Sequence, residues 1–213
     1  MCFNAKSSII TFGIGVIGSL ILMKYGNPKY SKDNFISGIF FLFIAGIQLM
    51  DFLFWIDLNN SKGINKIVTL FGPLFNIGQP IILYIVKLIY FKPKNIFSLT
   101  NYNLPVFILN FLYLLNLMYS YLSFLKTGKL TTGTSNGHLS WPWIKFSNAP
   151  FYLLLLAINI FYLMNFKYAL ILFLITYFFF ILSIIFFSYN PSELWCFFGA
   201  FIPFIMYGVS YII

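Results

Sequence analysis

The chain has 213 residues, of which 61% are hydrophobic and only 8% carry a charge. A soluble domain carries roughly 25% charged residues, so this composition excludes a soluble globular protein. It indicates an all-α, polytopic protein, integral to the membrane, whose main partner is the lipid bilayer. The net charge of +9 comes from lysines that stand between apolar runs, as interfacial anchors do. They form no basic cluster, which argues against nucleic acid as a partner.

Apolar runs long enough to cross about 30 Å of hydrocarbon at about 1.5 Å per residue recur along the chain. They predict a single transmembrane domain over residues 1–213, a bundle of seven transmembrane helices. The expected spans cover roughly residues 7–24, 34–56, 66–88, 102–124, 149–165, 168–188 and 193–212. The fifth and sixth spans are close enough to form a tight helical hairpin, and the one long connection is the inter-helix loop 126–148.

The first run contains Gly-Ile-Gly-Val-Ile-Gly at residues 13–18, which matches the dinucleotide-binding fingerprint letter for letter. That fingerprint requires a preceding strand and a βαβ unit, whereas this one lies inside an apolar helix. Small residues at this spacing let two transmembrane helices approach closely. We therefore expect helix packing here. The run also ends without a small-x-small cleavage site, which predicts a retained span.

The second run carries an amide and a carboxylate at membrane depth. Gln48, Asp51 and Trp55 stand at i, i+3 and i+7, so a helix places all three on one face. An unpaired charge in hydrocarbon costs several kcal/mol, which makes an intramembrane acid a functional-site hypothesis by default.

The third run is interrupted by two prolines, Pro73 and Pro80, and by two glycines. They predict a kinked or locally unwound helix whose freed carbonyls need partners. Asn76 and Gln79 lie near the midplane, one turn apart. Two interpretations stay open: the amides satisfy the broken backbone and bridge neighbouring helices, or they form a ligand or ion site at a helix break.

The last run opens with Glu193, Trp195 and Cys196. Glu193 in a first turn complements the helix dipole, which explains its position without any function. It also begins a face of 3-4 spaced residues that continues through Cys196, Ala200 and Pro203, which suggests that this face looks into the bundle.

Alternation of seven spans brings most of the chemically versatile residues to one leaflet. These are Cys2, Asp51, Trp55, Asp57, His138, Trp141, Trp143, Glu193, Trp195 and Cys196. One interpretation is an aromatic belt with capping carboxylates. The other is a pocket that opens to this face, floored by Gln48, Asn76 and Gln79, with loop 126–148 as its lid.

One combination of residues at this leaflet has the chemistry of metal ligands. Cys2, His138 and Cys196 with a carboxylate would suit zinc, although no close C-x-x-C spacing supports the site. A disulfide between Cys2 and Cys196 competes with it if that face is oxidising.

Three segments resemble a family of small bacterial and viral multi-pass membrane proteins. Residues 1–5, Met-Cys-Phe-Asn-Ala, are similar to the Met-Cys-Phe-Ser-Ala start of that family. Gln48, Asp51 and Trp55 resemble its His-Gln-x-x-Glu followed by Trp, and residues 195–198 resemble its Trp-Cys-Phe-Phe motif. The chain differs at Ile47, where the family pattern has His. The resemblance implies a seven-span membrane fold and brings no activity with it.

Three functional hypotheses follow. The first is binding or transport of a small ligand, ion or proton through a polar pocket around Asp51, lined by the candidate residues above. The second is a membrane-embedded enzyme that uses Asp51 and Glu193 as acid and base, with His138 or Cys196 assisting. The third is a non-catalytic scaffold in which the polar groups only lock helices together. No other cofactor is indicated: a retinal photoreceptor is disfavoured because the last span has no lysine for a Schiff base.

Overall fold

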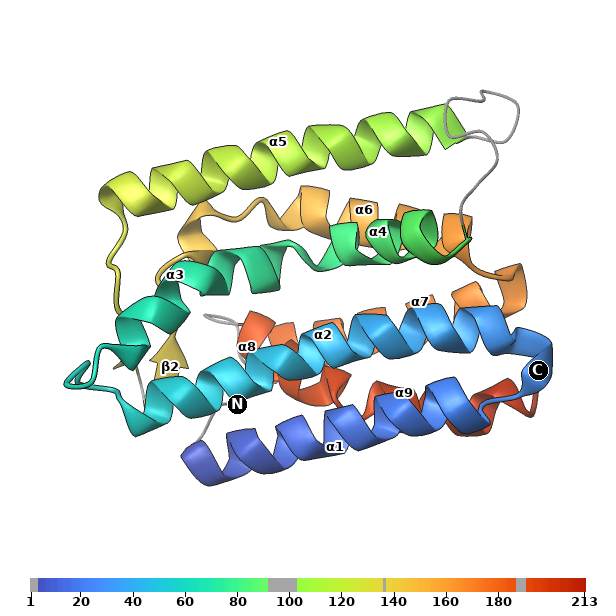
Figure 1. The fold of residues 1–213 in the computed structure, drawn as a ribbon, viewed down its shortest axis with the longest axis horizontal. Coiled ribbons are helices and arrows are strands. Elements are labelled where there is room, and N and C mark those ends of the chain that lie inside the picture. Colours follow the sequence, from blue (N-terminus) through green and yellow to red (C-terminus); the bar gives the residue numbers. More distant parts are fainter. Residues whose placement is uncertain (1–3, 92–102, 136, 187–190) are drawn as a thin grey trace.

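The structure, a computed structural model, describes residues 4–91, 103–135, 137–186 and 191–213. Four long helices run along the longest axis of the molecule (Figure 1): α1 (Ala5–Tyr25), α2 (Ser31–Ile56), α5 (Asn103–Thr127) and α7 (Phe166–Phe186). The shorter helices are α3 (Ile64–Ile77), α4 (Gln79–Phe91), α6 (Ala149–Leu163), α8 (Pro191–Gly199) and α9 (Ile202–Ser210). The remaining elements are η1 (Pro28–Tyr30), η2 (Ile144–Phe146) and the antiparallel strands β1 (Gly133–Ser135) and β2 (His138–Ser140).

The described chain is almost entirely helical, as predicted, and four of its helices are long and apolar enough to cross a membrane. The number rises to five if α3 and α4, which meet at a bend of 69°, form one broken span. Two further apolar segments are shorter, Ala149–Leu163 and Leu194–Ser210. These helices are consistent with an integral, multi-pass membrane protein. They account for four or five of the seven predicted spans by length alone.

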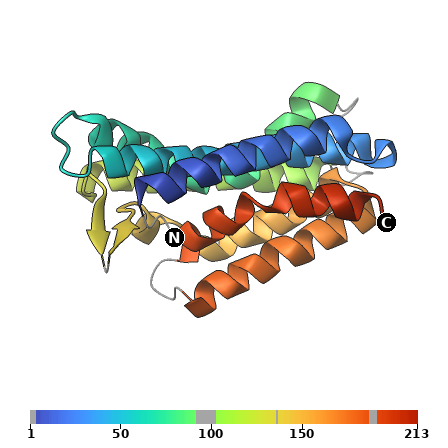
Figure 2. The ribbon, with the colours of Figure 1, turned by 90° about the horizontal axis from the view of Figure 1, so that it is seen from below.

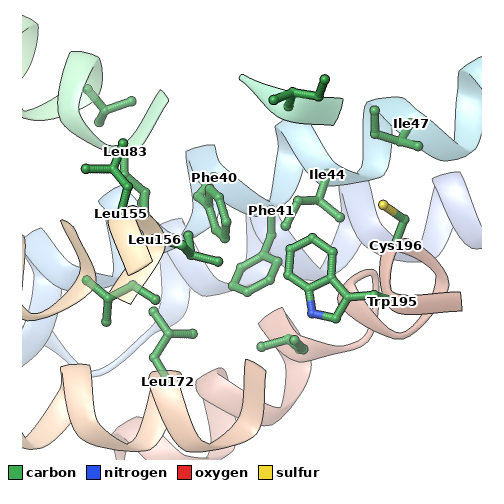
Figure 3. Packing of buried hydrophobic residues seen from close by; sticks show 14 of the residues in the cluster. Phe40, Phe41, Ile44, Ile47, Leu83, Leu155, Leu156, Leu172, Trp195 and Cys196 are labelled. Carbon is green, nitrogen blue, oxygen red and sulfur yellow. The ribbon is translucent and has the colours of Figure 1, made fainter. Parts of the chain in front are cut away.

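Helix α2 lies at the centre of the bundle. Of its most apolar window 50% is buried, compared with 33% for α1, 28% for α5 and 22% for α7. Figure 3 shows its residues Phe40, Phe41 and Ile44 gathered with leucines of α6 and α7 and with Trp195 of α8. The other long helices keep large apolar side chains on their outer faces, where lipid is the matching solvent.

Local sequence explains where the helices begin. Asn4 caps α1, because its side chain accepts a hydrogen bond from the Ser7 N–H at 2.9 Å. Asn148 caps α6 in the same way, accepting from the Phe151 N–H at 3.2 Å, and Pro150 in the first turn has no N–H to satisfy. Only two residues separate α6 from α7, which confirms the predicted tight hairpin.

Two of the three glycines of α1, Gly15 and Gly18, pack inside the molecule. A Cβ added at Gly15 would lie 2.8 Å from the Cβ of Ala45 in α2 and 3.2 Å from that of Ala200. One at Gly18 would lie 2.7 Å from the ring of Phe204 in α9. Since no side chain fits at these positions, the small residues do permit close helix approach, which confirms the packing interpretation of the glycine motif.

The last predicted span differs from the structure in one respect. In place of one helix over 193–212, the chain forms α8 and α9 with a break between Gly199 and Ile202. Pro203 stands in the first turn of α9, where its missing N–H costs nothing, whereas in the middle of a continuous helix it would remove a hydrogen bond.

Candidate functional site

The bend between α3 and α4 is the centre of the candidate site. The bend falls at Gly78, within the stretch from Phe75 to Pro80. It leaves backbone carbonyls without helical partners. Two backbone carbonyls beside the bend accept hydrogen bonds from side chains of later helices. The Tyr113 hydroxyl of α5 donates to the Ile77 carbonyl at 2.7 Å, and the Asn159 amide of α6 donates to the Pro80 carbonyl at 2.9 Å. The sequence correctly predicts the break and the need for such partners.

A cavity of about 130 Å³ lies beside this bend, between α3, η2, α6, α7 and α8. Most of its wall is apolar, and a few polar side chains interrupt it, a composition typical of small-molecule sites. The lining residues used below are Asn76, Ser147, Ala149, Tyr152 and Trp195. Asn76 and Trp195 are candidate residues from the sequence, and the structure brings them to the same cavity.

Gln79 stands directly behind the cavity wall. Its side chain is fully buried, and its Oε1 accepts a hydrogen bond from the hydroxyl of Tyr152, which lines the cavity. Its Nε2 has no hydrogen-bond partner among the described residues. A buried amide N–H₂ without a partner is uncommon in native structures and calls for an explanation.

Trp195 holds the opposite wall. Its indole Nε1 donates to the Thr176 carbonyl of α7 at 3.2 Å, and its ring meets that of Tyr152 edge to face, with ring centroids 6.3 Å apart. Trp195 is 3% exposed and packs in the core of the bundle.

Gln48, Asp51 and Trp55 lie on α2, with Gln48 and Asp51 fully buried and Trp55 partly buried. Asp51 accepts a hydrogen bond from the indole Nε1 of Trp141 at 3.0 Å. Neither polar atom of the Gln48 side chain has a hydrogen-bond partner among the described residues. None of the three lines the cavity beside the bend, whose wall contains Asn76 and Trp195.

Loop 126–148 enters the bundle through its tryptophans. Trp141 and Trp143 stack with centroids 5.4 Å apart, and both are almost completely buried. Trp143 packs on Gly72 of α3 so closely that an added Cβ would lie 2.3 Å from the ring. The loop predicted to be a lid is therefore anchored in the core by these two rings. The Asp51 carboxylate accepts the hydrogen bond of the Trp141 indole.

The rest of the loop is tied to the start of α3. The Thr132 N–H donates to Asn65 Oδ1 at 2.8 Å, and Asn65 Nδ2 donates back to the Thr132 carbonyl at 2.8 Å.

Asp57 accepts from the N–H groups of Lys62 and Asn65 at 3.0 and 3.1 Å. Desolvation raises the pKa of Asp57, but these N–H groups and the Ser61 hydroxyl outweigh it and hold the pKa below its usual range.

His138 lies in β2, opposite Ser135, and is partly buried outside the cavity. Burial lowers its pKa below the usual value, since desolvation disfavours the charged imidazole. Cys196 is fully buried in α8. Among the described residues, no three His, Cys, Asp or Glu side chains come together to hold a metal ion. Cys2 and the side chain of Glu193 lie outside the described residues, so the zinc and disulfide hypotheses stay predictions.

Sequence reasoning missed two contributors to this region. Asn110 and Asn159 form a reciprocal amide pair between α5 and α6, with bonds of 3.0 and 2.9 Å, and Tyr152 links Gln79 to the cavity. The asparagines carried a signal, since an amide inside an apolar span needs a partner. Tyr152 carried none, because a tyrosine in an aromatic-rich span is ordinary.

The arrangement is therefore an apolar cavity at a helix break, with hydroxyl and amide groups in and directly behind its wall. In this form it suits binding of a small molecule. Comparisons with protein-family models, with curated proteins and with solved structures gave no match.

Proposed function

We propose that this protein is a seven-span membrane protein that binds a small ligand in the cavity beside the α3–α4 bend. The seven spans are the four long helices, the bent pair α3–α4, the short helix α6, and α8 with α9. In this topology the chain begins at one membrane face and ends at the other, and the start of α1 and the C-terminus lie at opposite ends of the bundle (Figure 1). Broken helices of this kind line binding sites in membrane transporters.

The observation that supports binding is the unpartnered amide nitrogen of Gln79, whose Oε1 accepts a hydrogen bond from Tyr152 in the wall of an apolar cavity. An N–H₂ group buried without a partner costs free energy of about 1–3 kcal/mol, which a ligand oxygen or a bound water would recover. The cavity wall is apolar on most sides, so the matching ligand has an apolar body and one hydrogen-bond acceptor. Asn76 and Tyr152 supply the remaining polar contacts.

Asp51 has an indirect part in this proposal. Its hydrogen bond to Trp141 fixes loop 126–148, and that loop contributes Ile144 and Ser147 to the cavity wall. The carboxylate thus shapes the site from outside the cavity. An ion or proton path along α2 through Gln48 and Asp51 is a narrower form of the same proposal, and the unpartnered Gln48 amide supports it.

Replacing one of two alanines of α6 by phenylalanine gives a matched pair of variants that tests the proposal. Ala149→Phe places a ring in the cavity, whereas Ala157→Phe adds the same ring two turns along the same helix, away from the lining residues. Protein purified in detergent is denatured, and the released small molecules are identified by mass spectrometry. We expect wild type and Ala157→Phe to retain a molecule that Ala149→Phe retains at least tenfold less.

A scaffold without a ligand is the second candidate, favoured by polar groups that already satisfy one another, such as Asp51 with Trp141 and Asn110 with Asn159. If wild type retains no molecule beyond bulk lipid and detergent, and both alanine variants behave alike, the ligand proposal is wrong and the scaffold is supported.

A further inference from the structure

Loop 126–148 carries a groove of about 410 Å³ on its surface, formed by the β1–β2 hairpin, η2 and the residues next to them. The hairpin lies at the end of the bundle where α2 ends and α3 begins, in two perpendicular views (Figures 1 and 2). Because the apolar helices end here, this position corresponds to the membrane–water interface. The groove is lined by Lys129, Thr131, Gly133, Thr134, Ser140, Trp141, Pro142, Ile144 and Lys145, of which Ile144 also lines the ligand cavity.

Two attachments to the bundle hold the groove in shape. On one side, the N–H and the carbonyl of Thr132 are both bonded to the side chain of Asn65 in α3, each at 2.8 Å. On the other side, Trp141 donates its indole N–H to the buried Asp51 at 3.0 Å. The residues that flank Thr132 and Trp141 line the groove, and the β1–β2 pairing joins the two sides. A site with walls fixed in this way loses little free energy to ordering when a ligand binds.

The charge of the groove comes from two lysines in its lining. A Cβ added at Gly133 would lie 3.9 Å from the Lys129 Nζ, which places this ammonium beside the groove wall. Lys145 is exposed, and its Nζ lies 5.8 Å from the ring centroid of Phe146, near the outer limit of a cation–π contact. Among the described residues, no acid lines the groove. Its surface therefore favours an anion.

The acids described at this end of the bundle are directed elsewhere. Asp57 accepts hydrogen bonds from the backbone N–H groups of Lys62 and Asn65, and it is 2% exposed. Asp51 is fully buried, on the indole N–H of Trp141. Neither carboxylate belongs to the groove lining, so an anion in the groove meets the two ammonium groups first.

The polar lining indicates which anion fits. Besides the two lysines it contains the hydroxyl groups of Thr131, Thr134 and Ser140. Lysine binds phosphate as a point charge, and a hydroxyl can donate a hydrogen bond to a phosphate oxygen. A phosphate monoester carries a charge of about −1.5 to −2 at pH 7 and three strong acceptor oxygens. Two ammonium groups and three hydroxyls match that charge and that number of acceptors, whereas a carboxylate has a single charge and two oxygens.

We propose that this groove binds a phosphate monoester group, with the ammonium groups of Lys129 and Lys145 against its charge. The hydroxyls of Thr131, Thr134 and Ser140 donate hydrogen bonds to its oxygens. The phosphate belongs either to a soluble molecule or to the headgroup of a lipid such as phosphatidic acid, because a groove at the membrane–water interface is open to both. The proposal does not depend on the ligand of the cavity.

Isothermal titration calorimetry of the full chain in a neutral detergent tests the proposal. The probes are inorganic phosphate, short-chain phosphatidic acid and phosphatidylcholine with the same chains. The test variant is Lys129→Gln with Lys145→Gln. The control is Lys62→Gln with Lys66→Gln, which removes the same charge from exposed positions at the same end of the bundle, outside the groove.

An exposed ion pair contributes up to about fivefold in affinity, so the test pair should weaken phosphate binding about 10- to 25-fold. We expect the control pair to weaken it less than about threefold, since only the general attraction of a basic surface is reduced. Ser140→Ala keeps both lysines and should weaken binding about twofold to fivefold. Thermal unfolding of each variant establishes that it is folded.

The two phosphate probes distinguish the sources. Tighter binding of phosphatidic acid than of inorganic phosphate identifies a lipid headgroup, and comparable binding identifies a soluble phosphate; both support the proposal if the test pair loses that binding. The proposal is wrong if neither probe binds saturably at millimolar concentration, or if the two double variants lose binding equally. It is also wrong if wild type binds phosphatidylcholine as tightly as phosphatidic acid, because the charge of the phosphate is then not recognised.

Discussion

Replacing Asn159 by leucine tests whether the amide pair stabilises the broken span. Asn159 is fully buried and makes three hydrogen bonds: it donates to the Pro80 carbonyl and to Asn110 Oδ1, and it accepts from Asn110 Nδ2. Leucine fills a similar volume but leaves the Pro80 carbonyl and Asn110 Oδ1 without those donors. Asn110 Nδ2 retains only its bond to the Val106 carbonyl.

The expected loss follows from the number of bonds. Interhelical hydrogen bonds in membranes contribute about 0.6 kcal/mol on average and up to about 1.7 kcal/mol. Loss of three of them, with Asn110 Oδ1 left buried without its donor, gives a destabilisation of about 2–4 kcal/mol. The double variant Asn110→Leu with Asn159→Leu removes one of the orphaned partners, so its loss should be smaller than the sum of the single losses by about 1–2 kcal/mol.

The assay is reversible unfolding by sodium dodecyl sulfate in mixed micelles, followed by tryptophan fluorescence. Asn116→Leu, on the same helix as Asn110 but outside the pair, is the control and should lie within about 0.5 kcal/mol of wild type. The reasoning is refuted if Asn159→Leu is as stable as this control, or if the two single losses simply add.

The remaining predictions concern the loop and its attachment. Gly72→Ala should destabilise the protein by about 1–3 kcal/mol and shift tryptophan emission to longer wavelength, because the new methyl group displaces the Trp143 ring; unchanged emission would contradict the packing. The pKa of Asp57 is lowered on folding, so its contribution is present above its unfolded pKa near 3.8 and is lost as the pH falls through the folded value. Melting temperatures of wild type and Asp57→Asn should therefore converge as the pH falls below 3.8. The pKa of His138 is also lowered, so the unfolded state binds the proton first and stability falls as the pH drops below 6.5. His138→Gln should remove that slope, and an identical slope in the variant would show that another group titrates.

The sequence predicted the helical segments well because their signal is local. Every described long helix falls within a few residues of its expected range, and the break near Pro73 and Pro80 followed from proline and glycine alone. The break before Pro203 was missed, although the same rule applies there. A single proline near the end of an apolar run is compatible with a continuous helix and with a broken one.

The site was harder to predict because it depends on distant partners. Asp51 stood out as an acid in an apolar run, but its partner Trp141 lies 90 residues away and came from a segment expected to be a lid. Nothing local shows that an interfacial tryptophan turns inward. Asn76 and Trp195, both candidate residues from the sequence, line one cavity, whereas Tyr152 gives no signal that separates it from other tyrosines.

The bend between α3 and α4 also has a consequence for biosynthesis. The carbonyl of Pro80 receives its donor from Asn159, which is 79 residues later in the chain. At about 5–20 residues per second, the ribosome needs roughly 4–16 s to supply that donor after Pro80 is made. During this interval the bent α3–α4 segment lacks the Asn159 donor. The hydrogen bond from α6 to the bend is therefore expected to form only after most of the chain has been made.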